Sequence, residues 1–224
     1  LIRRQRQMCI RDRNVPLAEE IISAVAAAVK IPVTVKMRLG WSRDTINAVE
    51  LAIAAESAGA AAITVHGRTR EDFYAGTADW REIKKVVNAV RIPVIGNGDV
   101  ADGPTAKALI EETGCAAVAI GRAAWGNPWV FRAVNTYLET GEILPVPSWE
   151  ERLAMARKHL HGLCVEKGER IAVREMRAHA SRYFHGLPKA TVLRREIMKA
   201  LTEEEFGRIL TGYEEELGLE EPEA

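Results

Sequence analysis

Four short apolar segments share one pattern, in which a run of β-branched residues ends in polar residues and glycine. They cover residues 31–38, 61–68, 92–99 and 115–122. Continuous apolar runs of this length are typical of strands buried on both faces of a sheet. Each run is followed by a helix-length amphipathic stretch, which predicts βα units and a parallel sheet. The polar residues then lie at the carboxyl ends of the strands, where parallel α/β folds build active sites, so an enzyme is the leading hypothesis.

Helical spacing of apolar residues and turn signals place the remaining elements. Ser148 and Glu151 form a capping-box pattern that begins a second region, and that region is helical throughout. A linker with two prolines, residues 141–147, precedes it. The helices expected in the first region cover residues 16–30, 45–57, 79–90, 102–113 and 130–139.

Four strand–helix units amount to half of an eightfold barrel, which needs ~250 residues. A doubly wound sheet is the alternative. We favour an α/β fold in which residues 14–145 form the C-terminal half of a (β/α)8 TIM barrel. Residues 146–224 then form an all-α helical domain with an acidic tail. A half barrel would leave two open edges, so this interpretation implies further sequence upstream.

Residues 1–13 do not fit either region. They contain five arginines and no apolar period. An arginine-rich arm for RNA is one interpretation. The string Arg6-Gln-Met-Cys-Ile-Arg-Asp-Arg13 also resembles a translated sequencing adapter, and we therefore interpret the segment as non-native.

Charge is balanced over the whole chain but unevenly distributed. Lys plus Arg and Asp plus Glu both number 31. Residues 151–200 carry 12 Lys or Arg against 5 acids, whereas residues 201–224 carry 9 acids and one Arg, which indicates a polyanion-binding surface beside a solvated end. No run reaches the ~18 apolar residues of a membrane span. Three cysteines without metal-ligand spacing fit a reducing compartment, so we expect a cytoplasmic protein without a bound metal.

Two glycine clusters close the last two strands. Gly98 lies between Asn97 and Asp99, and Gly121 precedes Arg122. Glycines let backbone amides approach a phosphate, and an arginine can bind it through two hydrogen bonds. Phosphate sites after strands seven and eight recur in barrels. The alternative is that these glycines only form tight turns.

The first two strands end in Lys36 with Arg38 and in His66 with Arg68. A lysine between buried strand residues is expected to meet an anion, such as a reduced cofactor ring. The alternative is a lysine at the rim that reaches water. His66 occupies the repeat position of Lys36 and Asn97, which favours a functional role over a hydrogen bond to a neighbouring loop.

The residues and the order of four motifs resemble those of the tRNA-dihydrouridine synthase family, and the resemblance is nearest to its bacterial B-type members. The similarity extends from about residue 15 to about residue 213. The motifs are Val35-Lys-Met-Arg38, His66-Gly-Arg-Thr-Arg70, Ile95-Gly-Asn-Gly-Asp99 and Ile120-Gly-Arg-Ala-Ala-Trp-Gly-Asn-Pro-Trp129.

This resemblance implies an FMN-dependent barrel with a helical tRNA-binding domain, which reduces uridine in tRNA to 5,6-dihydrouridine with NADPH. It further implies that Lys36 and His66 contact the flavin or its ribityl chain. Gly121 with Arg122 would bind its phosphate. The three remaining flavin-binding positions are Asn97, Gly98 and Asp99.

The resemblance also implies a catalytic cysteine that protonates the uracil ring, within an Asn-x-Gly-Cys-Pro segment. The sequence lacks that segment. Cys9 lies in the segment interpreted as non-native, Cys115 at the amino end of its strand, and Cys164 in the helical region. We therefore assign no catalytic residue within this chain and expect the 224-residue chain to be inactive alone.

RNA must present an unstacked base to a flavin. Arg170, Arg174 and Arg177 share one helical face and are expected to bind phosphates. The alternative is that these arginines only form a solvent-exposed face of the helix and bind no RNA. Tyr183 and Phe184 could stack on RNA or pack in the core. The other arginines expected to contact RNA are Arg38, Arg68, Arg70 and Arg182.

Two other functions stay open. A flavin barrel acting on a small molecule would explain the strands but not the basic helical region. A non-catalytic RNA-binding module would explain only the latter. The sequence does not reveal which uridine would be modified, and a monomer is the simplest expectation for the oligomeric state.

Overall fold

The computed structural model describes residues 14–218, so the segment interpreted as non-native, 1–13, and residues 219–224 lie outside the described residues. The chain divides into two compact units. Among the described residues, the first takes in 14–122 together with Phe131–Ile143. The second consists of Ala123–Val130 and 144–218. Nothing in the sequence pattern indicates that residues 123–130 belong with the helical part.

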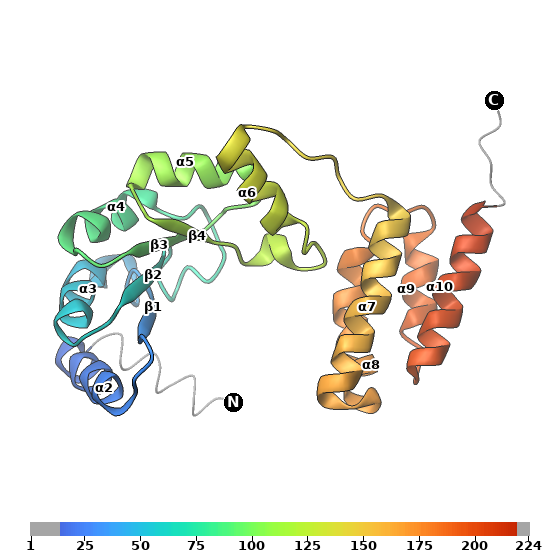
Figure 1. Ribbon diagram of the computed structural model, residues 1–224, viewed down its shortest axis with the longest axis horizontal. Helices are drawn as coiled ribbons and strands as arrows, with labels where there is room; N and C mark the ends of the chain where they lie inside the picture. Colours follow the sequence, from blue (N-terminus) through green and yellow to red (C-terminus); the bar gives the residue numbers. More distant parts are fainter. Residues whose placement is uncertain (1–13, 219–224) are drawn as a thin grey trace. The chain divides into compact units, whose positions relative to one another are not determined.

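The first unit is built on a parallel sheet of four strands in the order β1-β2-β3-β4 (Figure 1). The strands are β1 (Thr34–Arg38), β2 (Ala62–His66), β3 (Val94–Asn97) and β4 (Ala117–Ala119). Each strand pairs with the next one along the chain, so the described residues contain no point at which the strand order reverses. The described residues therefore form a parallel α/β sheet whose strands follow one another in chain order.

Helices connect the strands and cover one face of the sheet (Figure 1). The three that pack on it are α3, α4 and α5. Their face of the sheet carries Ile63, Val65 and Val94, which are buried. The helices of the unit are α2 (Val15–Ala28), α3 (Ala48–Ser57), α4 (Trp80–Ala89), α5 (Gly103–Thr113) and α6 (Val130–Thr140), with short 3-10 helices η1 (Arg43–Thr45) and η2 (Arg122–Ala124).

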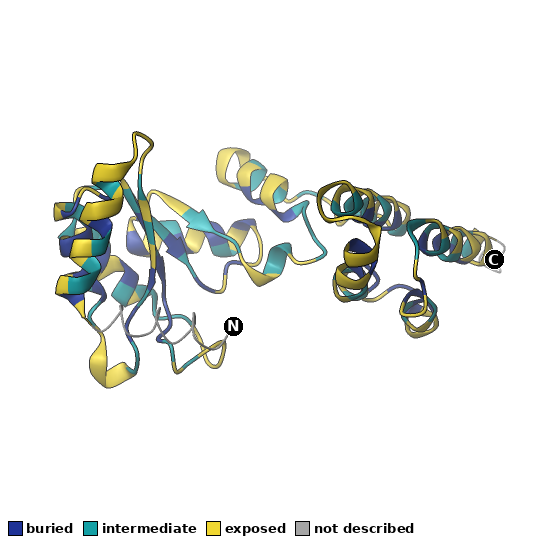
Figure 2. Cartoon of the chain, turned by 90° about the horizontal axis from the view of Figure 1, so that it is seen from below, coloured by how far each residue is buried: buried dark blue, intermediate teal, exposed yellow. Residues whose placement is uncertain are grey.

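The opposite face of the sheet is more exposed than the sequence analysis expected. The apolar runs predicted strands buried on both faces, but the register aligns Lys36, Thr64 and Ile95 across this second face, and none of the three is buried. Figure 2 shows how buried residues, in dark blue, and exposed residues, in yellow, are distributed over the described elements. The reason is that the described helices pack on the first face.

Local signals set most helix ends as expected. Asp102 and Thr105 form a capping box at the start of α5, and Gly114 ends it in the left-handed conformation at φ 74°. The helix predicted at residue 45 instead begins at Ala48. Ile46 forms an isolated antiparallel bridge with Gly40, and Asn47 adopts the non-helical conformation that precedes α3.

The second unit is helical in its described residues. Ser148 and Glu151 form the predicted capping box at the start of α7. Gly168 alone separates α7 from α8, at φ 78°. The hydrophobic core of the second unit includes Leu153, Met176, Phe184 and Phe206. The four helices are α7 (Trp149–Lys167), α8 (Glu169–Tyr183), α9 (Ala190–Ile197) and α10 (Glu203–Gly218).

None of the helices in the described part of the chain is long and apolar enough to cross a membrane. Within the same residues, His, Cys, Asp and Glu side chains do not gather into a group of three that could hold a metal ion.

Candidate cofactor and substrate site

The carboxyl ends of the first three strands bring Lys36 and Asn97 together. Lys36 Nζ donates to Asn97 Oδ1 at 2.9 Å, and Asn97 Nδ2 donates to the Ala119 carbonyl oxygen at 2.7 Å. Burial lowers the pKa of the Lys36 ammonium from its ordinary value, and the charge of Arg38 lowers it further. The cation is held in place by an amide and not by a carboxylate, so its charge remains available to an anionic ligand.

His66 lies beside Asn97 in the sheet register and is buried. Burial lowers its pKa to about 4, with further lowering from the charges of Arg38, Lys36 and Arg68. The imidazole is therefore neutral at pH 7, with one donor and one acceptor nitrogen. His66 can form hydrogen bonds to a polar ring or a hydroxyl group but does not add charge.

Asp99 links two arginines at the end of β3. Its Oδ2 accepts from Arg68 Nη2 at 2.9 Å, and its Oδ1 accepts from Arg122 Nη2 at 3.1 Å. Burial alone would raise the pKa of the Asp99 carboxyl, but the hydrogen bonds from Arg68 and the Ala78 amide, with the charges of both arginines, lower it below its ordinary value. Asp99 stays ionised and orients both guanidinium groups.

Gly98 and Gly121 have different surroundings. Gly98 has a φ of 137°, and a Cβ built on it would lie 2.6 Å from the Cβ of Ala78. Only glycine fits this turn without strain. A Cβ on Gly121 would meet nothing within 4 Å, so its backbone is open to a ligand. The Arg122 guanidinium beside it lies 4.8 Å from the ring centre of Tyr74.

Arg38 and Arg68 organise the loop that follows β2. Arg38 Nη1 donates to the carbonyl oxygens of Thr69 at 2.7 Å and Phe73 at 3.2 Å. Arg68, only 2% exposed, donates to the carbonyl oxygens of Ala75 and Gly76. Its Nη1 is buried without a hydrogen-bond partner among the described residues. Both side chains are therefore directed into the fold of this loop.

The same loop exposes two aromatic rings that the sequence analysis did not select. Phe73 is 57% exposed and Tyr74 is 58% exposed. The Arg70 guanidinium lies 4.3 Å from the ring centre of Phe73. Exposed aromatic rings beside arginines are typical of surfaces that stack nucleobases. Only their position directly after the His66–Arg70 motif could have indicated them.

The arginines predicted in the helical unit have different surroundings. Arg170 and Arg174 are exposed on α8. Arg177 Nη2 donates to the Ala200 carbonyl oxygen at 2.8 Å, so part of its guanidinium is used within the protein. The Arg182 guanidinium lies 4.9 Å from the ring centre of Trp125. Of the two aromatic residues considered for stacking, Tyr183 and Phe184 are both buried.

The cysteines of the described residues lie away from the carboxyl ends of the strands. Cys115 is buried two residues before β4 begins, at its amino end as expected. Cys164 lies in α7, and burial together with the neighbouring Glu203 and Glu169 raises its pKa to about 11. A thiol with so high a pKa is a poor nucleophile at neutral pH.

A family-level sequence model described as "Dihydrouridine synthase (Dus)" matches residues 12–217. The chain belongs to this family. Curated relatives of this Dus chain include a protein named tRNA-dihydrouridine synthase B in Pseudomonas aeruginosa, 45% identical over 182 residues, which cover 81% of the chain and 55% of the relative. A probable tRNA-dihydrouridine synthase of Rickettsia bellii is also 45% identical, with 81% of the chain and 56% of the relative covered.

The Dus chain spans about half the length of the curated relatives it matches. Among solved structures, a mandelate oxidase is 16% identical with a TM-score of 0.32, covering 89% of the chain and 67% of that protein. A superposition this loose supports no inference about fold or chemistry.

Proposed function

We propose that the chain is the flavin-binding and RNA-binding part of an enzyme that reduces uridine to 5,6-dihydrouridine in tRNA, with FMN as cofactor and NADPH as reductant. Membership of the Dus family supports this, as do the names of its relatives. The observation that carries the proposal is a group of cationic and amide donors at the carboxyl ends of the strands. Lys36, Asn97 and Arg122 form this group.

The residues present fit FMN. Gly121 leaves open space at its backbone, and Arg122 beside it is half exposed, so together they would hold a phosphate. The buried Nη1 of Arg68 is a donor without a partner in the described residues. Asp99 would hold Arg122 in position through its hydrogen bond. Gly98 allows the turn in which Asp99 lies.

Lys36, His66 and Asn97 would face the ring or the ribityl chain. Bound FMN supplies hydride transfer to C6 of the uracil ring. The Lys36 ammonium would stabilise negative charge, because its partner Asn97 is neutral. Neutral His66 and the Asn97 amide would orient the bound group through hydrogen bonds. None of the described cysteines is assigned the proton transfer to C5.

Arg38, Arg68 and Arg70 would serve the RNA substrate in two ways. Arg38 and Arg68 hold the loop after β2 through its carbonyl oxygens. Arg70 and the exposed rings of Phe73 and Tyr74 would meet the RNA itself. Exposed Arg170, Arg174 and Arg182 would contact phosphates of the tRNA, with an affinity that falls as salt rises.

We also propose that the sheet is half of a closed (β/α)8 barrel and that residues 146–224 form the helical tRNA-binding domain. The incompletely buried second face, with Lys36, Thr64 and Ile95, supports the first part, because further strands would cover such a face in a closed barrel.

Absorption spectroscopy of the full-length gene product tests the function. A flavin spectrum that NADPH bleaches, and that unmodified tRNA restores without oxygen, is the expected result. Bleaching without recovery by tRNA would favour a dehydrogenase acting on a small molecule. A protein without flavin would contradict the proposal.

Arg122→Ala tests the phosphate assignment. We expect flavin to be lost on dialysis, because the variant lacks the guanidinium beside Gly121. Arg91→Ala is the matched control, since Arg91 is exposed and precedes β3 at its amino end. Flavin occupancy equal in Arg122→Ala and the control would contradict the assignment.

A further inference from the structure

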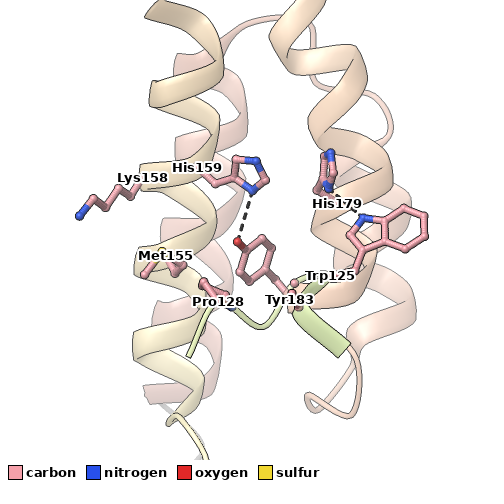
Figure 3. A pocket seen from close by; sticks show the side chains of 9 residues that line it. Trp125, Pro128, Met155, Lys158, His159, His179 and Tyr183 are labelled. Carbon is pink, nitrogen blue, oxygen red and sulfur yellow. Dashed lines mark hydrogen bonds between the residues drawn. The ribbon is translucent and has the colours of Figure 1, made fainter. Parts of the chain in front are cut away.

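The helical unit contains a hollow of about 390 Å³ between α7, α8 and the segment Ala123–Val130 (Figure 3). This volume is within the range of ~300–1,000 Å³ typical of small-ligand pockets. Four aromatic rings from three parts of the chain line it, namely Trp125, His159, His179 and Tyr183. The roles proposed for the strand ends do not involve this hollow.

The rings fix one another through their polar atoms. Trp125 Nε1 donates to His179 Nδ1 at 2.8 Å, and Tyr183 Oη lies 3.2 Å from His159 Nδ1 (Figure 3). The two imidazole centres are 4.8 Å apart. An indole nitrogen can only donate, so His179 Nδ1 is an acceptor and the proton of the neutral ring is on Nε2. His179 Nε2 therefore remains a donor outside this contact.

Trp125 is held in place although its side chain is not buried. It is 46% exposed, with its nitrogen on His179 and the Arg182 guanidinium 4.9 Å from its ring centre. An indole already fixed at its polar end loses little conformational freedom when another ring stacks on it. Its exposed surface is therefore preorganised for a flat partner.

The surroundings of the hollow favour a ligand with negative charge beside its ring. None of the nine residues lining it is acidic. Lys158 is one of the lining residues, and its side chain extends from α7 away from the rings (Figure 3). Arg182 adds a second cation beside Trp125. A nucleotide combines a flat ring with a phosphate of this charge.

We propose that this hollow receives an unpaired nucleobase of an RNA strand, stacked on Trp125, with the adjoining phosphates near Lys158 and Arg182. The inference rests on the proposed tRNA substrate and adds a base-binding site in the helical unit, separate from the strand-end site. Its function is to fix the RNA by one splayed base, so that binding depends on a ring stack in addition to charge.

The first test compares tRNA affinity at constant salt in the full-length gene product. Trp125→Leu is expected to bind unmodified tRNA about tenfold more weakly than the unaltered protein, the size expected for one lost base stack. Trp125→Phe, which keeps a ring but loses the donor to His179, is expected to lie between them. Val165→Ala is the control, because Val165 is exposed elsewhere on α7 and is expected to bind normally.

Equal affinity in Trp125→Leu and Val165→Ala would overturn the inference and leave the proposed function intact. Failure of the unaltered protein to bind tRNA would instead overturn the proposed function, and this inference with it. Circular dichroism establishes that each variant is folded. If Trp125→Leu unfolds, Trp125→Phe decides, since affinity equal to the control would overturn the inference.

The second test identifies the source of the base. Tryptophan fluorescence is titrated with an oligouridylate, uridine monophosphate or NADPH, and the quenching lost in Trp125→Phe is assigned to Trp125. We expect the oligonucleotide to quench at micromolar concentration and the two free nucleotides only at concentrations at least tenfold higher. Equal or stronger quenching by NADPH would assign the hollow to a free dinucleotide and overturn the RNA inference.

Discussion

The Asp99 carboxylate accepts a hydrogen bond of 2.9 Å from Arg68, a guanidinium whose side chain is only 2% exposed. The second oxygen of the same carboxylate accepts from Arg122, whose side chain is 54% exposed. One acid therefore serves a buried arginine that shapes the loop after β2 and an accessible arginine at the proposed phosphate site. The two contacts should differ in their effect on stability.

Asp99→Asn should lower the free energy of unfolding by about 2 kcal/mol, because a buried arginine loses its counter-charge. Asparagine is the suitable replacement, since it tolerates the positive φ of 59° at this position. Arg122→Ala breaks only the exposed pair and should change stability by less than about 1 kcal/mol. Urea denaturation measures both, and equal losses would contradict the difference inferred between the two arginines.

The lowered pKa of His66 should reduce the free energy of unfolding in mild acid. Its pKa is about 4 in the folded chain and near 6.5 when unfolded. Between these values the unfolded chain binds the extra proton, so stability falls as pH drops from about 6.5 to 4, by up to roughly 3 kcal/mol. Denaturation midpoints at pH 7.5 and 4.5 should differ less in His66→Gln than in the unaltered protein. An unchanged pH dependence in that variant would assign the effect to other groups.

Arg177 and Arg174 lie on the same helix but should respond differently to substitution. Arg177→Met should lower the free energy of unfolding by about 1–2 kcal/mol, because the Ala200 carbonyl oxygen loses its donor. Arg174→Met should leave stability within about 0.5 kcal/mol. It should nevertheless weaken tRNA binding and reduce the slope of log affinity against log salt by about 1. A stable Arg177→Met variant would contradict the structural role of that side chain.

Gly98→Ala and Gly121→Ala form a matched pair. Alanine at position 98 would need a φ of 137° and would press on Ala78, so we expect a loss of about 2 kcal/mol or more. Alanine at position 121 meets no neighbouring atom, and stability should stay within about 1 kcal/mol. Thermal unfolding of the two variants provides the comparison. Equal destabilisation would show that the loop at Gly121 is more crowded than described.

The sequence predicts those parts of the fold that depend on neighbouring residues. The strand runs, the capping box at Ser148 and a helix that ends at residue 113 all follow from local pattern. The start of α3 could not be predicted, because the bridge between Gly40 and Ile46 depends on how the loop folds back. The incomplete burial of the second face of the sheet could not be predicted either, because an apolar run does not reveal which of its two faces other elements cover.

For the candidate site, the residue types were predictable but their contacts were not. Lys36, His66 and Asn97 are predicted as equivalent positions of a repeat, but this equivalence is wrong for Lys36, because the register aligns Arg38 with His66 and Asn97. The long Lys36 side chain nevertheless reaches Asn97 Oδ1 at 2.9 Å. Arg68 and Arg177 are selected for their charge, yet both donate to backbone carbonyl oxygens. Arg68 does so within the loop after β2, and Arg177 does so at Ala200, 23 residues along the chain. The hydrogen bond between Trp125 and His179 spans 54 residues, and no local pattern indicates a contact of that range.

The single residue between α7 and α8 bears on how the chain reaches this structure. Because Gly168 alone joins the two helices, their contacts form between residues close in sequence. Each strand pair of the sheet instead forms only after a loop of about 20 to 30 residues has brought its two strands together. Local contacts form early and long-range pairings late, so we expect the helical hairpin to fold first and the sheet to set the overall folding rate.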